Sequence, residues 1–279
     1  MPELPEAETI VRGLRPEVVG EEIRRVEVVH EDILRQPRRR FADRVRHCTV
    51  EAVERRGKNV LLRLDSGDRV AVNLGMTGRL LPFPAPPRGR RRPTHPAVRF
   101  RFRGGGVLVF DDVRRFGTVE CLEPEEWAER DQRMGPEPLD DGFTAARLHR
   151  DLARSRSPLR SWLLDQRRIA GVGNIYANEA AWAAGIHPRR PARSVTGEEA
   201  EALWRALRRI LSGAIRHGGT TIRDYRNASG REGDFARRLA VYGREGERCP
   251  RCSATVERLV FGNRSAFLCP ACQPWEGTP

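Results

Sequence analysis

The chain has 279 residues, of which 51 are Lys or Arg and 38 are Asp or Glu, and its formal net charge is +13. The hydrophobic fraction of 39% is enough for a folded core, and this length accommodates two or three domains. The positive charge favours a polyanionic partner, nucleic acid before an acidic membrane surface. No stretch approaches the about 20 apolar residues of a membrane span, and the start of the chain lacks the apolar segment of a signal peptide. We therefore expect a cytoplasmic protein.

The chain begins with the sequence MPELPE. Once Met1 is removed, Pro2 carries a secondary amine whose reference pKa of about 8 leaves a fair share unprotonated at neutral pH. Such an amine can attack a sugar C1′ or a carbonyl and form an iminium, with Glu3 and Glu6 as acid and base. The same residues suit the first turn of a helix, so this pattern alone leaves a purely structural role open.

Two periodicities follow one another in the first half of the chain. Apolar spacing predicts a helix over residues 5–20, which Pro16 should kink. From about 23 to 122 the alternation has period two and predicts an antiparallel sheet domain, a sandwich. A basic, Pro-rich loop over residues 82–93 interrupts it.

The second half is helical. It follows a linker at residues 134–142, and a capping signal, Thr196 with Glu199, marks the start of its last helix. Residues 218–247 are rich in Gly, Arg and Asn and predict a long loop plus a strand. The expected helices lie near residues 144–153, 158–166, 174–185 and 197–217.

Lys58 is the only lysine, and all the other basic residues among the 51 are arginine. Arg cannot shuttle a proton, whereas Lys can, so we expect chemistry or a point-charge contact at Lys58. Chance survival of one lysine is the alternative.

Two turns that follow predicted strands, at residues 73–78 and 111–117, each present a bulky apolar side chain, Met76 and Phe116. Such side chains wedge between bases in proteins that kink DNA or flip nucleotides, although either one alone would more often be core packing.

A glycine-rich turn, AGVGNIY over residues 170–176, lies between two predicted helices. Its amides at the start of the following helix predict a phosphate site with Asn174 as an additional donor. A tight helix–helix turn is the alternative.

Four cysteines near the end of the chain have the spacing C-x2-C-x16-C-x2-C. Two such knuckles place four thiolates around one zinc ion and leave no open position, so the predicted site is structural. The hairpin predicted over residues 261–267 carries Arg264 near its tip. Cys48 and Cys121 lie far apart in strand-like surroundings and are expected to be inert core residues. The predicted ligands are Cys249, Cys252, Cys269 and Cys272.

Taken together, these segments resemble the formamidopyrimidine-DNA glycosylase/endonuclease VIII family along the whole chain and in family order. The start is similar to its PELPE nucleophile segment, residues 161–179 to its helix-two-turn-helix motif, and the last 31 residues to its zinc finger. Val113, Asn73 and Ala7 depart from the Pro, His and Val usual in the family and leave Pro2 unaffected. Further matches are residues 57–58, 74–78, 114–117, 135–139 and 241–244.

The resemblance implies an α+β multidomain fold. Residues 1–133 would form an N-terminal catalytic β-sandwich domain with flanking helices. Residues 134–240 would form a helical helix-two-turn-helix domain with a lesion-capping loop, and residues 241–279 a zinc-finger hairpin. The implied activity is that of a bifunctional DNA glycosylase/AP lyase of base excision repair. It would remove oxidised purines (formamidopyrimidines and 8-oxoguanine) and cleave the strand by β,δ-elimination.

The resemblance also implies roles for single residues. Pro2 would attack C1′, Glu3 would give a proton to the opening sugar, and Lys58 would assist β-elimination and bind phosphate. Arg264 would serve δ-elimination and contact phosphate, and the loop around residues 218–240 would close over the extruded base. The implied DNA contacts are Met76, Arg114 and Phe116 in the gap left by the everted nucleotide, and Asn174, Arg156 and His95 on backbone phosphates.

Two alternatives remain open at this point. One is the same machinery directed at oxidised pyrimidines, as in endonuclease VIII, and the other is a catalytically silent zinc protein that binds damaged DNA and retains Met1. In each case we expect one structural zinc ion and double-stranded DNA with damaged bases as the partner. We also expect a monomer without membrane contact, associated with the nucleoid in the cytoplasm.

Overall fold

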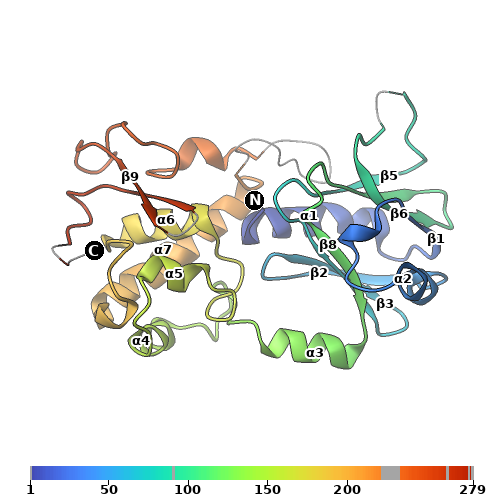
Figure 1. The fold of residues 1–279 in the computed structure, drawn as a ribbon, viewed down its shortest axis with the longest axis horizontal. Coiled ribbons are helices and arrows are strands. Elements are labelled where there is room, and N and C mark those ends of the chain that lie inside the picture. Colours follow the sequence, from blue (N-terminus) through green and yellow to red (C-terminus); the bar gives the residue numbers. More distant parts are fainter. Residues whose placement is uncertain (1, 90–91, 221–232, 262–263, 276, 278–279) are drawn as a thin grey trace. The chain divides into compact units, whose positions relative to one another are not determined.

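The computed structural model describes residues 2–89, 92–220, 233–261, 264–275 and 277 (Figure 1). The chain forms two compact units. The first comprises the residues up to 133 together with 217–236, and the second comprises 134–216 and 237–279. The finer division into three domains stays a prediction.

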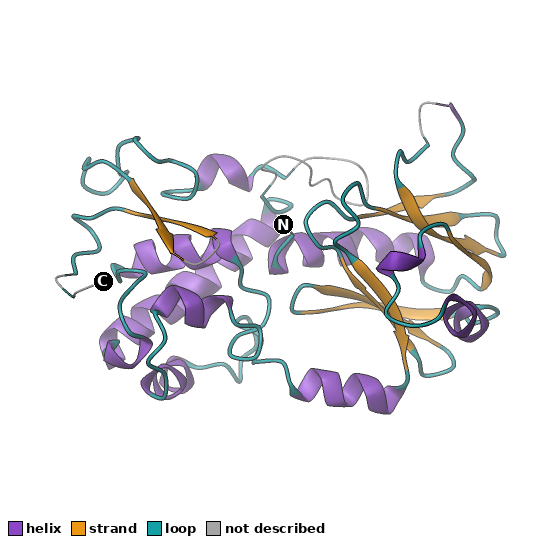
Figure 2. Ribbon diagram, in the orientation of Figure 1, coloured by secondary structure: helices purple, strands orange, loops and turns teal. Residues whose placement is uncertain are grey.

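The first unit contains two four-stranded antiparallel sheets, drawn as separate groups of orange arrows in Figure 2. Their strand orders are β1-β6-β7-β5 and β2-β3-β4-β8. The expected sandwich is therefore confirmed. The strands of the first sheet are β1 (Ile23–Val28), β6 (Pro96–Phe102), β7 (Val107–Asp111) and β5 (Arg79–Phe83). Those of the second are β2 (Val50–Arg56), β3 (Asn59–Leu64), β4 (Arg69–Asn73) and β8 (Thr118–Leu122).

One continuous core joins both sheets to the first helix, α1 (Leu4–Val18). Helix α1 contacts β2, β3 and β5 and buries its apolar stripe, Ile10, Val11, Leu14 and Val18, completely. Pro16 lies inside its last turn. The helix expected from apolar spacing is therefore present, and its packing against the strands fixes the position of its N-terminal end.

Two helices of the first unit were not predicted. Helix α2 (Arg38–Val45) falls inside the stretch that the sequence indicated as strands. Its eight residues bury only Phe41 and Val45, too few to show a helical period. Helix α3 (Pro124–Gln132) buries only Trp127, and a capping box between Glu123 and Glu126 begins it.

The second unit contains the helices that the sequence predicted, and its last helix begins as expected. The backbone N–H of Thr196 donates to Oε2 of Glu199 at 2.8 Å, and the N–H of Glu199 donates to the Thr196 hydroxyl at 3.3 Å. The helices are α4 (Ala145–Ala153), α5 (Leu159–Leu164), α6 (Asn174–Ala184) and α7 (Gly197–Arg216). The antiparallel pair β9 (Glu257–Phe261) and β10 (Arg264–Leu268) forms the predicted hairpin.

The prediction of a strand within residues 218–247 is wrong for the part of this range that the structure describes, where no strand is present. There, Thr220 forms one isolated antiparallel bridge with Asp234, and a short 3-10 helix, Phe235–Arg238, follows. Residues 221–232, the middle of the expected capping loop, lie outside the described residues, as do residues 90–91 of the Pro-rich loop. No described helix combines the length and the apolar character that crossing a membrane requires.

Candidate active site and metal centre

The N-terminal end of α1 holds the residues predicted to do the chemistry. Pro2 is buried, and the side chains of Glu3 and Glu6 are each 1% exposed. Glu3 is the N-cap of the helix and forms a capping box with Glu6, in which the backbone N–H of Glu3 donates to Oε2 of Glu6 at 2.8 Å. The structure thus brings Pro2, Glu3 and Glu6 together where the helix dipole is positive.

Glu6 also ties this end of α1 to the base of the expected capping loop. Its other oxygen, Oε1, accepts a hydrogen bond from the backbone N–H of Thr220 at 2.7 Å. The N–H of Asp234 donates to the carbonyl of His217 at 3.0 Å, and that of Phe235 donates to the carbonyl of Gly219 at 3.2 Å. The two described ends of the loop are therefore joined to each other and to the predicted nucleophile segment.

Lys58 lies in the two-residue turn between β2 and β3. Arg56 pairs with Asn59 across the hairpin, and Gly57 adopts a φ of 58°, as a turn with glycine in first position requires. The Lys58 side chain is half-buried. Its position follows from the hairpin register, because a shift of one residue would turn it to the other face.

Asn73, which departs from the family pattern, connects the Lys58 hairpin to the Met76 turn. Its amide nitrogen donates to Oδ1 of Asn59 at 3.1 Å, and its own Oδ1 accepts from the N–H of Gly75 at 3.1 Å. Asn59 in turn donates to the carbonyl of Arg56 at 3.2 Å. Asn73 therefore acts as donor and acceptor at once, which its two-headed amide allows.

The predicted wedge residues are exposed and lie on two adjoining turns. Met76 is 42% and Phe116 63% exposed, and the guanidinium carbon of Arg114 lies 5.9 Å from the centre of the Phe116 ring. A Cβ added at Gly75 would lie 2.5 Å from the backbone of Phe116 and Gly117, so the two turns touch through their main chains. These side chains are brought together as the sequence indicated.

His95 is exposed and is held beside these turns by its backbone. Its N–H donates to Oδ1 of Asp111 at 2.6 Å, and its carbonyl accepts from the N–H of Asp112 at 3.0 Å. His95 is thereby placed at the end of β7, where the turn of residues 111–117 begins.

In the second unit, Asn174 and Arg264 belong to one polar cluster. Asn174 is the first residue of α6, and its side-chain nitrogen donates to the carbonyl of Ser265, the neighbour of Arg264 in β10, at 3.1 Å. Arg160 donates to Oδ1 of Asn174 at 2.7 Å and to the same Ser265 carbonyl at 3.1 Å. Arg156 is exposed on the turn before α5, and no contact among the described residues joins it to this cluster.

Arg160 is a candidate functional residue that the sequence did not reveal. It is 3% exposed, and burial together with the charge of Arg264 lowers its pKa. Arg264 is exposed and forms no ion pair among the described residues. Two guanidinium groups whose positive charges act on one another favour a bound anion. No local signal marks Arg160, because an arginine in an arginine-rich chain is expected on the surface.

Helix α6 also anchors the C-terminal segment of the second unit. Asn178 accepts from the N–H of Phe267 at 2.7 Å. The buried carboxylate of Glu179 accepts from the N–H groups of residues 240, 241 and 242 at 2.8, 2.9 and 2.8 Å. Burial raises the pKa of Glu179, and the three N–H groups oppose that shift. The helix thus holds the segment that leads to the cysteine knuckles.

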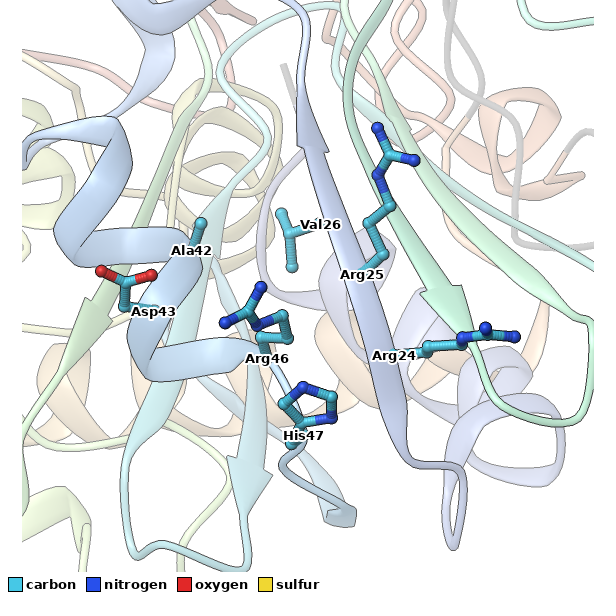
Figure 3. Close-up of a pocket in the computed structure, with 7 residues that line it drawn as sticks. All are labelled: Arg24, Arg25, Val26, Ala42, Asp43, Arg46 and His47. Carbon is cyan, nitrogen blue, oxygen red and sulfur yellow. The ribbon is translucent and has the colours of Figure 1, made fainter.

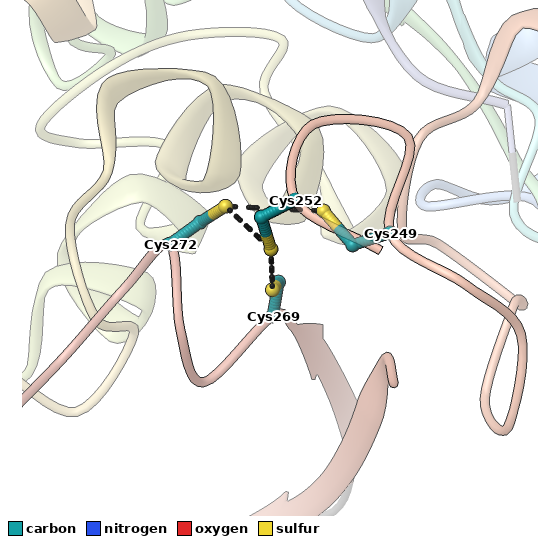
Figure 4. Close-up of side chains that lie close together, drawn as sticks. All are labelled: Cys249, Cys252, Cys269 and Cys272. Carbon is teal, nitrogen blue, oxygen red and sulfur yellow. Dashed lines mark hydrogen bonds between the residues drawn. The ribbon is translucent and has the colours of Figure 1, made fainter. Parts of the chain in front are cut away.

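The four C-terminal cysteines come together as predicted (Figure 4). All four Sγ atoms lie within 4.8 Å of one another, with 3.4 Å between Cys252 and Cys269 and 3.8 Å between Cys249 and Cys272. Sulfurs around a tetrahedral zinc ion, at about 2.3 Å from it, are about 3.8 Å apart. Burial, followed by the neighbouring thiols, raises the pKa of Cys272 to about 12, whereas burial of Cys249 is outweighed by the N–H groups of residues 251 and 252, which lower its pKa to about 6. A bound cation would favour the thiolate form of all four cysteines. The donor set fits zinc.

Two surface cavities lie away from these groups. One of about 360 Å³ lies between β1 and the end of α2, and its lining includes Arg24, Arg46 and His47 (Figure 3). The other, of about 450 Å³, includes His187 stacked on Trp275. Neither is lined by a predicted catalytic residue, so we do not assign the chemistry to them.

Comparison with known proteins decides the family. Residues 1–119 match the model of the formamidopyrimidine-DNA glycosylase N-terminal domain, and residues 134–226 match that of the formamidopyrimidine-DNA glycosylase H2TH domain. Residues 246–274 match the zinc finger found in FPG and IleRS. The chain belongs to the formamidopyrimidine-DNA glycosylase family. The predicted family, fold and enzyme class, a DNA glycosylase and AP lyase of base excision repair, are thereby confirmed.

Relatives in the formamidopyrimidine-DNA glycosylase family match over nearly the full length. The formamidopyrimidine-DNA glycosylase of Chloroflexus aggregans is 43% identical over 276 residues, 98% of each chain. The crystal structure of the MutM (FPG) protein from Thermus thermophilus has a TM-score of 0.87 and 41% identity, again over 98% of each chain. A Lactococcus lactis FPG mutant in complex with a Fapy-dG containing DNA has a TM-score of 0.91 and 30% identity, covering 98% of this chain and all of that one.

Proposed function

We propose that this member of the family removes oxidised purines, formamidopyrimidines and 8-oxoguanine, and then cuts the strand by β,δ-elimination. One observation carries the proposal: Pro2 is buried directly before α1, and Glu3 and Glu6, which form the capping box of that helix, are buried with it. The positive end of the helix disfavours a protonated amine there. The nucleophile is available once Met1 is removed.

The first step that we propose replaces the damaged base by the protein. The Pro2 nitrogen forms a bond to C1′ while the bond from C1′ to the base breaks. The base leaves with the bonding electron pair and takes up the proton that the Pro2 nitrogen loses. Glu3 gives a proton to the ring oxygen O4′, which opens the sugar and leaves an iminium between Pro2 and C1′.

The second stage uses that iminium as an electron sink. It acidifies the C2′ proton, and loss of this proton expels the 3′ phosphate in β-elimination, with the assistance of Lys58. A second elimination, in which water takes the C4′ proton, expels the 5′ phosphate, and we assign Arg264 to this step as the cation that holds that phosphate. Water then hydrolyses the iminium and releases Pro2.

The phosphate-binding residues and the wedge residues support extrusion of the nucleotide. Met76, Arg114 and Phe116 would fill the gap that it leaves, with Arg114 facing the orphaned base. Phosphates of the backbone would be held by Asn174, Arg160, Arg156, His95, Lys58 and Arg264. The capping role that we propose for the loop around residues 218–240 falls largely on residues 221–232, outside the described part of the chain.

We further propose that the knuckles bind one zinc ion, which is structural because four protein ligands leave no open position. Cys249, Cys252, Cys269 and Cys272 would hold it. We also propose that the protein acts as a monomer on duplex DNA, in the cytoplasm at the nucleoid, where its substrate lies.

A panel of duplexes, each with a single lesion, tests the substrate assignment. We expect faster single-turnover release of formamidopyrimidine and 8-oxoguanine than of thymine glycol. Faster release of thymine glycol would reassign the protein to oxidised pyrimidines. Binding to every duplex without release of any base would instead make it a silent damage binder, and intact-mass measurement would then be expected to show Met1 retained.

A further inference from the structure

A buried carboxylate, Asp112, joins the two turns that carry the wedge residues. Its side chain is 1% exposed and forms no ion pair among the described residues. Oδ1 accepts from the Thr77 hydroxyl at 2.5 Å and from the N–H of Arg114 at 3.3 Å, and Oδ2 accepts from the N–H of Gly117 at 2.8 Å. A buried carboxylate without a cation is stabilised only by such donors, so these contacts define its role.

The contacts of Asp112 surround a strained residue. Arg115 has a φ of 55°, in the left-handed region that a side chain such as that of Arg rarely adopts. The N–H groups of Arg114 and Gly117, on either side of it, both donate to the Asp112 carboxylate. The carboxylate therefore stabilises the backbone shape that presents Arg114 and Phe116.

The other turn is held by the same group. Thr77 directly follows Met76, and its hydroxyl both donates to Asp112 and accepts from the N–H of Arg114 at 3.2 Å. Gly75 adopts a φ of 57° and touches the backbone of Phe116 so closely that no side chain fits. Met76 and Phe116 would otherwise gain by collapsing onto the surface, because both are large, apolar and exposed.

We propose that Asp112 is a positioning residue that holds Met76, Arg114 and Phe116 as one rigid wedge. The inference rests on the proposed function, in which these side chains enter the gap in the duplex. A rigid wedge contacts the gap in the duplex without the entropy cost of first ordering its side chains. This benefit applies only to substrates from which a stacked nucleotide must be extruded.

Two substrates, compared for the same variant, therefore distinguish a positioning role of Asp112 from a general role in folding. The first is a duplex with whichever lesion the panel shows to be released fastest, so an error in the purine assignment leaves the test intact. The second is a single-stranded oligonucleotide with a preformed abasic site, where no paired nucleotide has to be extruded. In Asp112→Asn, one of the two carboxylate oxygens becomes an NH2 group, which cannot accept a hydrogen bond. If the NH2 group faces Gly117, the N–H of Gly117 loses its acceptor. If it faces Thr77, the Thr77 hydroxyl loses its acceptor.

For Asp112→Asn we expect single-turnover base release from the duplex to fall about tenfold, and cleavage of the single-stranded abasic site to change less than twofold. A 2-aminopurine base beside the lesion should show slower unstacking in the same variant. Thr77→Val, which leaves the carboxylate in place, should reproduce the selective loss even if Asp112→Asn folds poorly. The double variant should be no worse than the poorer single one.

Asp68→Asn is the matched control, because it alters a buried carboxylate of the same unit that pairs with Arg44 instead of with the turns. It should affect both substrates alike or neither. Equal losses on both substrates in Asp112→Asn, or unchanged release from the duplex, would overturn the proposal. If the wild type releases no base at all, the proposed function fails instead, and the 2-aminopurine signal still decides whether Asp112 governs unstacking.

Discussion

At the scale of single residues, the structural and the chemical interpretations of the N-terminus prove compatible. Glu3 and Glu6 begin the helix that the sequence indicated, and the hydrogen bonds of their capping box hold both side chains in place at the end that follows Pro2. A helix start with acidic capping residues thus also makes a rigid frame for an amine. The sequence could indicate these residues because the whole group is local, within six positions.

The Lys58 prediction belongs to this scale. Lys58→Ala should slow strand cleavage about 100-fold, because general acid–base assistance is lost, while base release changes less. Its half-buried place in a turn means that the free energy of unfolding should change by no more than about 0.5 kcal/mol. Single-turnover nicking assays and thermal unfolding measure the two effects.

Lys58→Arg is the matched control, since it keeps the positive charge and cannot transfer a proton at neutral pH. If Lys58 acts only as a point charge, the Arg variant should cleave like the wild type. Unchanged nicking in Lys58→Ala would refute any role in cleavage.

At the scale of helices and strands, the sequence indicated those with a clear period and missed those without one. The long helix α7 has a capping signal and an apolar stripe with a helical period. Helices α2 and α3 bury too few side chains for their sequences to show such a period. Asp112 and Arg160 are hidden for another reason. Each has a partner far along the chain, Thr77 at 35 positions from Asp112 and Ser265 at 105 positions from Arg160, and only the folded backbone brings these pairs together.

The anchor formed by α6 gives a prediction at this scale. Glu179→Ala leaves three N–H groups, two of them in buried hydrogen bonds, without an acceptor and should lower the stability of the second unit by about 3 kcal/mol. Hydrogen exchange of the amides of residues 240–242 should accelerate accordingly. Glu179→Gln, which keeps one acceptor oxygen, should show a smaller effect.

Glu198→Gln serves as the control, because Glu198 is an exposed acidic residue in the first turn of α7. It should leave exchange at residues 240–242 unchanged. Wild-type protection of these amides in Glu179→Ala would show that α6 does not anchor the segment.

At the scale of the whole molecule, we expect the net charge and the proposed zinc ion to support DNA binding in different ways. A net charge of +13 should make the affinity fall steeply with salt, through release of counterions. The first unit has its own core, whereas Cys249 and Cys269 form part of a small core cluster of the second unit. The cysteine spacing could predict the four-cysteine cluster because that spacing does not depend on the detailed fold. The polyanionic partner inferred from composition and the zinc ion stay predictions.

Removal of zinc should therefore abolish DNA binding and leave the sheet unit folded. Strong chelation, followed by anisotropy titration of a labelled duplex and by amide exchange of the strands, measures both, and re-addition of zinc should restore binding. Cys252→Ser should behave like the chelated protein, whereas Cys48→Ser, outside the tetrad, should bind normally. Full affinity without zinc would contradict the structural role of the metal.

The most direct measurement of the central claim is borohydride trapping on a damaged duplex, followed by mass spectrometry of the adduct's peptides. The account predicts a single cross-link between the Pro2 nitrogen and deoxyribose in protein that lacks Met1, and no adduct for Pro2→Gly. A fully active preparation whose N-terminus is blocked, or an adduct that persists in Pro2→Gly, would contradict it.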